Sequence, residues 1–504
     1  MIERPEGWTA PGADLVRSAA TDPVPDAGDL GAVHIVGIGG AGMSGLARIL
    51  LARGVTVSGS DARDSGAVAA LRALGATVHI GHAPANLGEP GGADQPDTVV
   101  YSTAIAATNP ELVEARARGL RVIRRAAALA SVIAQRRGVA IAGTHGKTTT
   151  TSLLTVAAQA CGLDPSFAIG GNLYETGLNA HEGTGEYFIV EADESDGSFL
   201  MLAPQAAIVT NVEADHLENH GDLAGVQRAF EQFVDRIVPG GTLLVCADDA
   251  GARQLADYAR GRDVRLLTYG EAADADVRVS GIVELPSAVR FTVEGGGIER
   301  REVVLGALVG RHMALNGAGA LALAVALGMD PARVAEAWAA FRGVHRRFEH
   351  RGTAAGVRVY DDYAHHPTEI AATLRGARAA TGSGRLIAVF QPGTFSRTQI
   401  FAREFADAMA LADIAVVMDV YPAREEPLPG VTGATIADLI ELPAERIVYE
   451  PSWSATPARI AAVAQPGDLV VTMGIGDVYL LCPEILGAVA ESIEGGPIEG
   501  GAAR

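Results

Sequence analysis

Cysteine is scarce in this chain of 504 residues. The three that occur, Cys161, Cys246 and Cys482, lie far apart and form no CxxC pair. Their number and spacing give no disulfide framework, and scattered free cysteines are typical of a reducing compartment. The sequence therefore predicts a cytoplasmic protein.

Long apolar runs and an excess of positive charge are also missing. No segment approaches about 18 uninterrupted apolar residues, so no membrane span is expected. The first 28 residues lack the apolar core of a signal peptide. The 40 basic residues are outnumbered by 60 acidic ones, which gives a net charge of −20. Because nucleic-acid affinity depends on lysine and arginine that neutralise phosphates, no nucleic-acid partner is expected, although helix N-termini and one lysine can still bind a small anion.

The length of the chain and its alternation of apolar strands with helices predict an α/β protein of three domains. The oligomeric state is not set by these patterns. The predicted organisation is a loose N-terminal arm over 1–28, a Rossmann-like domain over 29–130, a central P-loop ATPase-type domain over 138–342, a second Rossmann-like domain over 343–487 and an acidic, Gly-rich tail over 488–504.

The first glycine-rich stretch predicts a site for a diphosphate. Gly37, Gly39 and Gly42 form G-x-G-x-x-G between a predicted strand and a predicted helix, and Asp61 follows at the spacing of an acid that reaches a ribose hydroxyl. The glycines let backbone amides approach a pyrophosphate, and the helix dipole favours its charge. Tight strand–helix packing alone is the structural alternative. NAD and a uridine-diphosphate sugar both stay open as ligands, since each carries a pyrophosphate beside a ribose.

The second glycine-rich stretch, GTHGKT over 143–148, predicts a site for a nucleoside triphosphate. It is shorter than the GxxxxGK[ST] pattern, because Ile141 stands where that pattern has glycine. The chemistry survives the shortening: amides after Gly146 face phosphate oxygens, Lys147 neutralises their charge, and the Thr148 hydroxyl can bind Mg²⁺. A threonine-capped helix with an exposed lysine is the structural alternative.

Carboxylates follow the next predicted strand of the same domain. The stretch VEADESD supplies Glu191, Asp193, Glu194 and Asp196, of which one or two should face magnesium, a cation that prefers oxygen ligands. By itself an acidic cluster is more often a solvated loop, and its position after a strand of the P-loop sheet favours the metal. His216 ends a further strand and is a second candidate.

The order of the motifs along the chain resembles that of the Mur ligases. The motifs are GIGGAGMSG, GTHGKTTTT, EADESD, NVEADH, HRRFE, DDYAHHPTE, FQP…SRT and MGIGD, and together they cover roughly residues 31 to 480. The resemblance implies an enzyme that uses ATP to activate a carboxylate as an acyl phosphate, which an amine then attacks. Among these ligases the chain is similar to those that join a small amino acid, most often L-alanine, to the lactyl carboxylate of UDP-N-acetylmuramate. ADP and phosphate are released, and the product enters cytoplasmic peptidoglycan synthesis.

The resemblance also implies roles for individual residues. The UDP-sugar would be bound by Gly37, Gly39, Gly40, Gly42, Ser44, Asp61, Ser102 and Thr103. ATP would be bound by Gly143, Thr144, His145, Gly146, Lys147, Thr148, Thr149, Asn316 and Arg347. Mg²⁺ or Mn²⁺ would be held by Thr148, Glu191 and His216. The catalytic set would be Lys147, Glu191, His216, Arg347 and Asp362, and the amino acid would meet Tyr363, His365 and Arg397.

Two positions depart from the family pattern. Met313 replaces the first asparagine of His-Asn-x-x-Asn, which removes one hydrogen bond near adenine and predicts a change of about 1 kcal/mol in ATP affinity. Gly393 and Thr394 stand where histidine and arginine are usual, whereas Arg397 remains. One charge-assisted partner for the carboxylate of the amino acid is then missing, so glycine or L-serine stays an option beside L-alanine.

Other functions remain to be weighed against this one. A recycling ligase would add a tripeptide to the same sugar nucleotide, and a folate polyglutamate synthetase would lack the first glycine loop. An NAD-dependent oxidoreductase would leave DDYAHHP and the third domain without a role, and a non-catalytic scaffold would not keep Lys147, Thr148, Glu191 and His216. Closure of the ligase is expected at hinges near 126–138 and 340–347.

Overall fold

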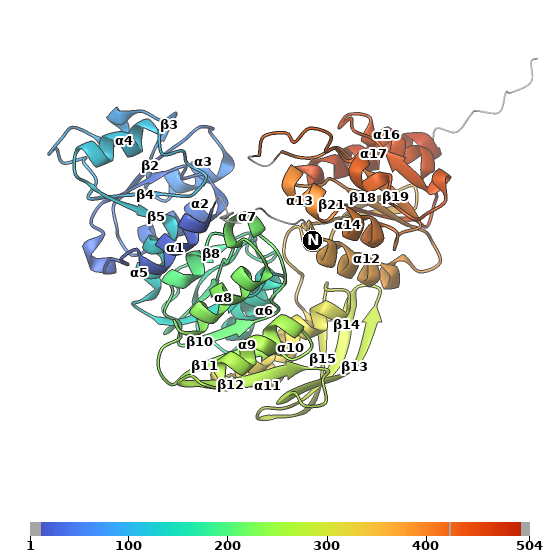
Figure 1. Ribbon diagram of the computed structural model, residues 1–504, viewed down its shortest axis with the longest axis horizontal. Coiled ribbons are helices and arrows are strands. Elements are labelled where there is room, and N and C mark those ends of the chain that lie inside the picture. Colours follow the sequence, from blue (N-terminus) through green and yellow to red (C-terminus); the bar gives the residue numbers. More distant parts are fainter. Residues whose placement is uncertain (1–11, 423–424, 495–504) are drawn as a thin grey trace, which may run out of the picture. The chain divides into compact units, whose positions relative to one another are not determined.

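The computed structural model describes residues 12–422 and 425–494. The chain forms two compact units. The first contains the chain up to Ser280 with Thr292–Arg301 and Leu315–Trp338, and the second contains Gly281–Phe291, Glu302–Ala314 and the chain from Ala339. Both units alternate strands with helices, which confirms the predicted α/β class (Figure 1). The predicted domain limits and hinges stay predictions.

The first unit opens with a five-stranded parallel sheet in the order β3-β2-β1-β4-β5. Because the order reverses between β1 and β4, their carboxyl ends border the crevice where such sheets bind ligands. Its elements are α1 (Ala13–Thr21), β1 (Val33–Val36), α2 (Ala41–Ala52), β2 (Val57–Asp61), α3 (Gly66–Ala73), β3 (Thr77–Ile80), β4 (Thr98–Tyr101), α4 (Pro110–Ala117), β5 (Arg121–Arg124) and α5 (Arg125–Ile133), with single 3₁₀ turns η1 (Ala27–Asp29) and η2 (Pro84–Leu87).

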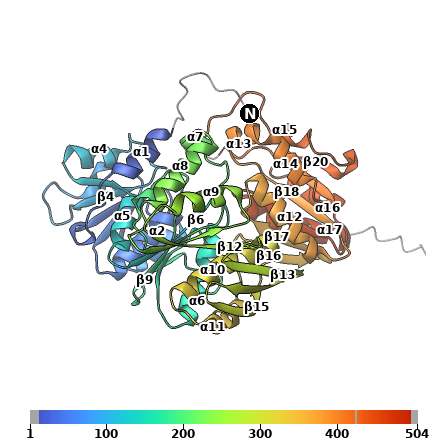
Figure 2. The same cartoon turned by 60° about the horizontal axis from the view of Figure 1, so that its bottom comes forward.

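A second, ten-stranded sheet follows in the order β15-β14-β13-β12-β11-β10-β6-β9-β7-β8. Strands β6, β9, β12, β13 and β15 of this sheet are labelled in Figure 2. Strand β6 pairs in parallel with β10 on one side and β9 on the other, so three carboxyl ends meet at one place. The elements are β6 (Arg137–Ala142), α6 (Lys147–Ala160), β7 (Ser166–Ala168), β8 (Ala180–His181), β9 (Tyr187–Glu191), η3 (Ser198–Met201), β10 (Ala206–Val209), α7 (Leu217–His220), α8 (Leu223–Val234), β11 (Gly241–Cys246), α9 (Ala250–Ala259), β12 (Val264–Gly270), β13 (Val277–Leu285), β14 (Ala288–Gly295), β15 (Ile298–Gly306), α10 (Arg311–Ala326) and α11 (Pro331–Ala339).

The second unit is built on a six-stranded sheet in the order β16-β17-β21-β18-β19-β20. Only β16 runs antiparallel to its neighbour, β17. The elements are β16 (Glu349–Ala354), β17 (Val357–Asp362), α12 (Pro367–Thr381), β18 (Leu386–Phe390), α13 (Phe395–Ile400), α14 (Ala402–Met409), β19 (Ile414–Val417), α15 (Ala434–Ala437), η4 (Ala444–Arg446), β20 (Ile447–Tyr449), α16 (Thr456–Val463), β21 (Leu469–Met473), η5 (Val478–Leu480) and α17 (Leu481–Glu494).

The two sheets of the first unit share one buried apolar cluster. It joins Ile35 on β1 and Leu46 on α2 to Val190 on β9 and Phe230 on α8. Polar contacts tie the same two parts together: Glu182 accepts from Arg53 at 3.0 Å and from Arg136 at 2.8 Å. The central strands β1, β6 and β10 are almost fully buried on both faces, as parallel strands covered by helices must be, whereas the edge strand β3 is partly exposed.

Both chain ends differ from the expected loose segments in their described parts. Residues 13–21, expected to lie in a loose arm, form helix α1. Helix α17 continues to Glu494, into the segment expected to be a tail, and residues 495–504 lie outside the described part of the chain. Within the described residues, none of the helices is long and apolar enough to cross a membrane.

Candidate active site

The first glycine loop connects β1 to α2 as the sequence predicted. Gly37 adopts φ +77°, and its N–H and that of Ile38 donate to the carbonyl of Ser60 on β2, at 2.8 and 2.9 Å. Helix α2 begins after Gly40 without a side-chain cap, and the amides of an uncapped first turn can bind an anion. The loop therefore has the backbone geometry of a phosphate cradle.

Asp61 closes this loop at the end of β2. Its carboxylate accepts from Gly39 N–H at 2.9 Å and from Arg63 N–H at 3.1 Å. A methyl carbon at Gly39 would lie 2.9 Å from that carboxylate, so the close approach needs glycine. The predicted acid is thus beside the loop.

Other predicted UDP-sugar residues lie around the same crevice. The Ser44 hydroxyl is buried in the first turn of α2 and donates to Ala41 O at 3.1 Å. Ser102 and Thr103 follow directly after β4, the strand beside β1. The structure adds Arg125, the first residue of α5, whose guanidinium lies 3.0 Å from the position of a methyl carbon at Gly42.

The second glycine loop connects β6 to α6. Gly146 adopts φ +83° and precedes α6, whose first residue is Lys147. The carboxamide of Asn316, on α10, stands over this turn, since a methyl carbon at Gly146 would lie 2.6 Å from its Oδ1. Thr148 and Thr149 follow as buried residues in the first turn of α6. The structure therefore brings the predicted Asn316 to the loop from far along the chain.

The end of β10 fixes the shape of this loop. Asn211 accepts from His145 N–H at 2.7 Å, and its side-chain amide donates to His145 O at 3.1 Å. Thr210 donates to the same carbonyl at 2.5 Å. The Thr144 hydroxyl accepts from Glu213 N–H at 2.9 Å. The loop is thus held in place before any ligand arrives, which lowers the cost of binding one.

Lys147 is the only lysine in the chain. Its Nζ lies 2.9 and 2.8 Å from the two carboxylate oxygens of Glu194 and donates to the carbonyls of Gly143 at 2.7 Å and Thr144 at 3.1 Å. Burial alone would lower the pKa of Lys147, but the charges of Glu194, Asp193 and Glu191 raise it above its ordinary value. The lysine is therefore cationic and surrounded by acids.

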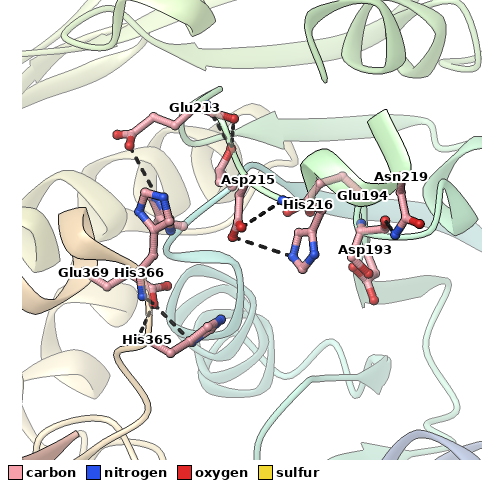
Figure 3. Close-up of polar contacts among 12 residues, drawn as sticks. Asp193, Glu194, Glu213, Asp215, His216, Asn219, His365, His366 and Glu369 are labelled. Atoms are coloured by element: carbon pink, nitrogen blue, oxygen red, sulfur yellow. Dashed lines mark hydrogen bonds and ion pairs between the residues drawn. The ribbon is translucent and has the colours of Figure 1, made fainter. Parts of the chain in front are cut away.

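The predicted metal residues follow three strands of the second sheet: Thr148 is in α6 after β6, while Glu191 ends β9 and His216 follows β10, the strands on either side of β6. The carboxylate of Glu191, at the end of β9, accepts from Gly170 N–H at 2.8 Å. His216 adopts φ +50°, and its Nε2 lies 3.6 Å from Asp215 (Figure 3). Its Nδ1 lies 3.3 Å from Glu218. A non-glycine residue in the left-handed region is strained, and such strain gathers at functional sites. Within the described residues, Glu191, Asp193 and Glu194 give Lys147 its three nearby negative charges.

In the second unit, Asp362 lies at the end of β17 and Arg347 in the loop before β16. The carboxylate of Asp362 accepts from Phe348 N–H at 2.8 Å and from Ala364 N–H at 2.7 Å. Burial raises the pKa of Asp362 to about 6, although the charge of Arg347 and the two amides oppose this. Asp362 is therefore a buried acid that shapes the loops around it.

The predicted amino-acid residues surround Tyr363. The Arg347 guanidinium lies 5.3 Å from the centre of its ring, and His365 meets the ring edge-on at 5.2 Å. Burial raises the pKa of Tyr363, and the charges of Arg347, Arg346 and the buried Arg397 on α13 act against it. The structure thus brings Tyr363, His365, Arg347 and Arg397 together.

Glu369 on α12 organises the histidines of DDYAHHPTE (Figure 3). Its carboxylate accepts from His365 N–H at 3.0 Å and from His366 N–H at 3.3 Å, and the His366 ring accepts from Thr368 N–H. This is a capping box, with Pro367 at the first helical position. The motif therefore begins helix α12, and this helix start orients His365 beside Tyr363.

Of the departures from the family pattern, the structure explains the glycine at position 393. A side chain at Gly393 would collide with Ile475, which fills the space. Thr394 adopts φ +68° and caps α13 by accepting from Arg397 N–H at 3.3 Å. Met313 is buried in the first turn of α10.

Two arginines of the site were missed by sequence reasoning. Arg125 belongs to no local motif, and the contact with Gly42 that reveals it joins distant parts of the chain. The sequence pattern pointed to Arg347 as the functional residue and not to the adjacent Arg346. The Arg346 guanidinium donates to Asp361 at 3.2 Å and to Gly474 O at 2.9 Å, and it lies over the rings of Tyr363 and Tyr479. No sequence signal separates two adjacent arginines.

Family models cover most of the chain. Residues 32–137 match the Mur ligase family, catalytic domain; residues 141–324 match the Mur ligase middle domain; and residues 346–476 match the Mur ligase, glutamate ligase domain. The chain belongs to the Mur ligase family. The resemblance seen in its motifs is thereby confirmed.

Two curated members of the Mur ligase family show how similar the chain is to its relatives. UDP-N-acetylmuramate–L-alanine ligase from Saccharopolyspora erythraea is 56% identical over 459 residues, which cover 91% of this chain and 93% of that protein. The enzyme of the same name from Acidothermus cellulolyticus is 54% identical and covers 92% of this chain and 96% of its own length.

Solved Mur ligase structures share the fold. The crystal structure of UDP-N-acetylmuramate-alanine ligase MurC from Thermotoga maritima has a TM-score of 0.74 and 27% identity, covering 92% of this chain and 99% of its own. A murein peptide ligase from Psychrobacter arcticus has a TM-score of 0.66, also at 27% identity, and covers 91% of this chain and 98% of its own.

Proposed function

We propose that this Mur ligase joins L-alanine to the lactyl carboxylate of UDP-N-acetylmuramate, at the expense of ATP. The observation that carries the proposal is the pair of glycine loops in one chain, of which only the second has a lysine among three carboxylates. One loop suits a diphosphate and the other a triphosphate with its metal. The high identity to UDP-N-acetylmuramate–L-alanine ligases supports the choice of substrates.

The first step is phosphoryl transfer to the sugar nucleotide. An oxygen of the lactyl carboxylate attacks the γ-phosphorus of ATP, the bond to the bridging β–γ oxygen breaks, and ADP leaves. Such transfers need little covalent chemistry from the protein, because positioning and charge neutralisation suffice. The amides at the start of α6 and the ammonium of Lys147 would supply both, and Asn316 would lie on the adenine side.

The residues around Lys147 fit a divalent cation as well as a phosphate. Thr148 and Glu191 offer hard oxygen atoms, His216 stands at the end of the neighbouring segment, and Mg²⁺ accepts such ligands. We propose that these three residues hold Mg²⁺ or Mn²⁺, which would neutralise charge on the phosphates. Lys147 would then exchange its bond with Glu194 for phosphate oxygens, since both partners compete for the same ammonium.

The second step forms the amide bond. The amine of L-alanine attacks the acyl carbon, the carbon–oxygen bond to phosphate breaks, and the nitrogen loses a proton as phosphate leaves. The residues grouped around Tyr363 in the second unit would bind the amino acid, with Arg397 and His365 as partners for its carboxylate. Arg347 and Asp362 would act in nucleotide binding and closure.

The setting of the reaction follows from its substrates. A ligase that consumes ATP and a nucleotide sugar works where both are made, so we place it in the cytoplasm, in peptidoglycan precursor synthesis. The scattered free cysteines agree with this setting.

Phosphate release from the purified protein tests the proposal. Release should require ATP, Mg²⁺, UDP-N-acetylmuramate and an amino acid together, with L-alanine preferred over glycine and L-serine. Activity with a tripeptide in place of alanine would instead establish a recycling ligase. Binding of NADH without any effect of the sugar nucleotide would favour an oxidoreductase.

A further inference from the structure

The helix α1 precedes the residues that match the family and has no role in the proposed reaction. It packs on the first sheet through Arg124, the last residue of β5. The Arg124 guanidinium donates to Leu15 O at 3.3 Å, to the Ser18 hydroxyl and to the Asp22 carboxylate at 2.8 Å. The next residue is Arg125, which faces the first glycine loop. One side of α1 is therefore anchored beside the sugar-nucleotide loop.

The other side of α1 rests on segments of the second sheet. Gly12 N–H donates to Glu218 O on α7 at 2.9 Å. Val16 lies on the turn at Gly197, which has φ +76°, and a methyl carbon at Gly197 would lie 2.9 Å from Val16 Cα. Helix α1 also contacts η3, which begins directly after that turn. The approach is so close that only glycine fits beneath the helix.

These two segments hold Glu194, the partner of Lys147. From α7, Asn219 donates its amide to Ser195 O at 2.7 Å, and His220 donates from Nε2 to Glu194 O at 2.8 Å. Gly197 N–H donates to the same Glu194 carbonyl at 3.0 Å. Figure 3 shows Asn219 beside Glu194 and Asp193. The backbone of Glu194 is thus fixed by the two segments that α1 covers.

We infer that α1 is a brace that positions Glu194, and through it Lys147, from outside the active site, while tying these groups to the first glycine loop. This inference rests on the proposed function for its kinetic readout. The contacts described for the helix are with Arg124, α7 and the turn at Gly197, so its effect on Glu194 passes through the last two segments. It is a positioning element, and it extends the site to a part of the chain that the family models do not cover.

Gly12→Ala tests the brace with a single methyl group. Gly12 has a negative φ of −96°, which alanine can adopt, but its methyl carbon would lie 1.6 Å from Asn219 Oδ1 and 2.7 Å from its Cγ and displace the amide from Ser195. Gly28→Ala is the matched control, because nothing lies within 4 Å of a methyl carbon there. Since small displacements of positioning groups cost large rate factors, kcat/KM for ATP should fall about 3- to 10-fold in Gly12→Ala. The KM for UDP-N-acetylmuramate and the Gly28→Ala variant should stay at wild-type values.

A double-mutant cycle identifies the route of the effect. Asn219→Ala alone should lower kcat/KM for ATP, and adding Gly12→Ala to it should have no further effect. Equal losses in the Gly12→Ala and Gly28→Ala variants, full additivity in the cycle, or a lower Tm with unchanged kinetics would each overturn the inference.

The failure of the brace can be separated from failure of the proposed function. If the wild-type protein shows no phosphate release with L-alanine, the substrate assignment is wrong. The affinity of each variant for ADP with Mg²⁺, measured by calorimetry, still tests the brace: Gly12→Ala should bind less tightly than Gly28→Ala, and equal affinities would contradict it.

Discussion

The two glycine loops of the first unit look alike in sequence but are supported in opposite ways. Each follows a buried parallel strand, turns at a glycine with positive φ and begins a helix that lacks a side-chain cap. The first loop is supported by an acid, because the Asp61 carboxylate accepts a hydrogen bond from the backbone N–H of Gly39 in the loop. The second carries its own cation, Lys147, inside a group of carboxylates.

This difference fits the proposed function, in which one chain would bind two anionic nucleotides at different sites. A loop without its own cation binds an anion through backbone amides and the helix dipole. These groups suit a diphosphate whose oxygens stay partly exposed to solvent. A triphosphate with a metal needs both a cation and carboxylates beside the phosphates. Changes at either loop should therefore separate the two substrates in kinetics.

Removal of the only lysine should have the largest effect. We expect Lys147→Met to lower kcat/KM for ATP by roughly 10³-fold, because a preorganised charge on the transferring phosphoryl group is lost. It also leaves Glu194 buried without its cation, so the Tm should fall. Binding of UDP-N-acetylmuramate, measured by calorimetry, should stay unchanged.

Lys147→Arg keeps the charge and serves as the control. It should recover the Tm better than the activity, since a guanidinium does not reproduce the point charge of an ammonium. If Lys147→Met weakened sugar-nucleotide binding as much as ATP use, the two loops would not be independent.

Glu111 contacts the first loop through Ser60, and its carboxylate should contribute to the free energy of unfolding of the first unit. The Ser60 hydroxyl donates to Glu111 at 2.6 Å, while the Ser60 carbonyl holds Gly37 and Ile38. Burial would raise the pKa of Glu111, but the nearby His34 ring, 3.8 Å away, and hydrogen bonds from Ser60 and Asn86 outweigh it and lower the pKa from 4.5 to about 2. Stability from this carboxylate is present above pH 4.5 and is lost as the pH falls toward 2.

Glu111→Gln should therefore destabilise the first unit most at neutral pH. A shift of this size corresponds to about 3 kcal/mol, at 1.36 kcal/mol per pKa unit. The urea midpoint of the first unfolding transition should differ from wild type at pH 7, and the difference should shrink between pH 4.5 and 3 as wild-type Glu111 loses its advantage. A difference that stays constant over this range would show that the charge of Glu111 is not what stabilises the loop.

Arg125 should supply the cation that the first loop lacks. We expect Arg125→Ala to raise the KM for UDP-N-acetylmuramate about 10-fold, as loss of one charge-assisted bond to a phosphate would. The KM for ATP should not change. The exposed Arg116 on α4 gives the control, Arg116→Ala, in which initial rates should match wild type. An equal rise of KM in both variants would assign the effect to net charge.

Local patterns sufficed to predict the parts of the site that lie close together in sequence. The strand, turn and helix around Gly37 and Gly146 are set by glycine and by apolar runs, and the structure has them where they were predicted. Asp61 was found from its spacing alone, because consecutive parallel strands end at the same edge of the sheet.

Contacts between distant segments could not be predicted in this way. Arg125 reaches Gly42 only because α5 packs beside α2. The sequence offered four acids after β9, and only the structure shows that Glu194 is the one paired with Lys147. Helix α1 was expected to be loose, since its composition gives no sign of the Arg124 contacts that hold it. Residue roles within the site stay predictions that the variants above can test.

Substitution of Met313 should have the smallest effect on the kinetics. It tests whether a residue near the second loop contributes to ATP binding. Met313 lies one turn before Asn316 on α10, is buried, and replaces an asparagine of the family pattern. If the lost hydrogen bond contributes about 1 kcal/mol, Met313→Asn should lower the KM for ATP by no more than about 5-fold. The asparagine also brings a polar group to a buried position, which costs stability unless it finds a partner. A lower KM with an unchanged Tm would show that adenine supplies that partner, whereas a lower Tm with an unchanged KM would show that the thioether at this position serves packing alone.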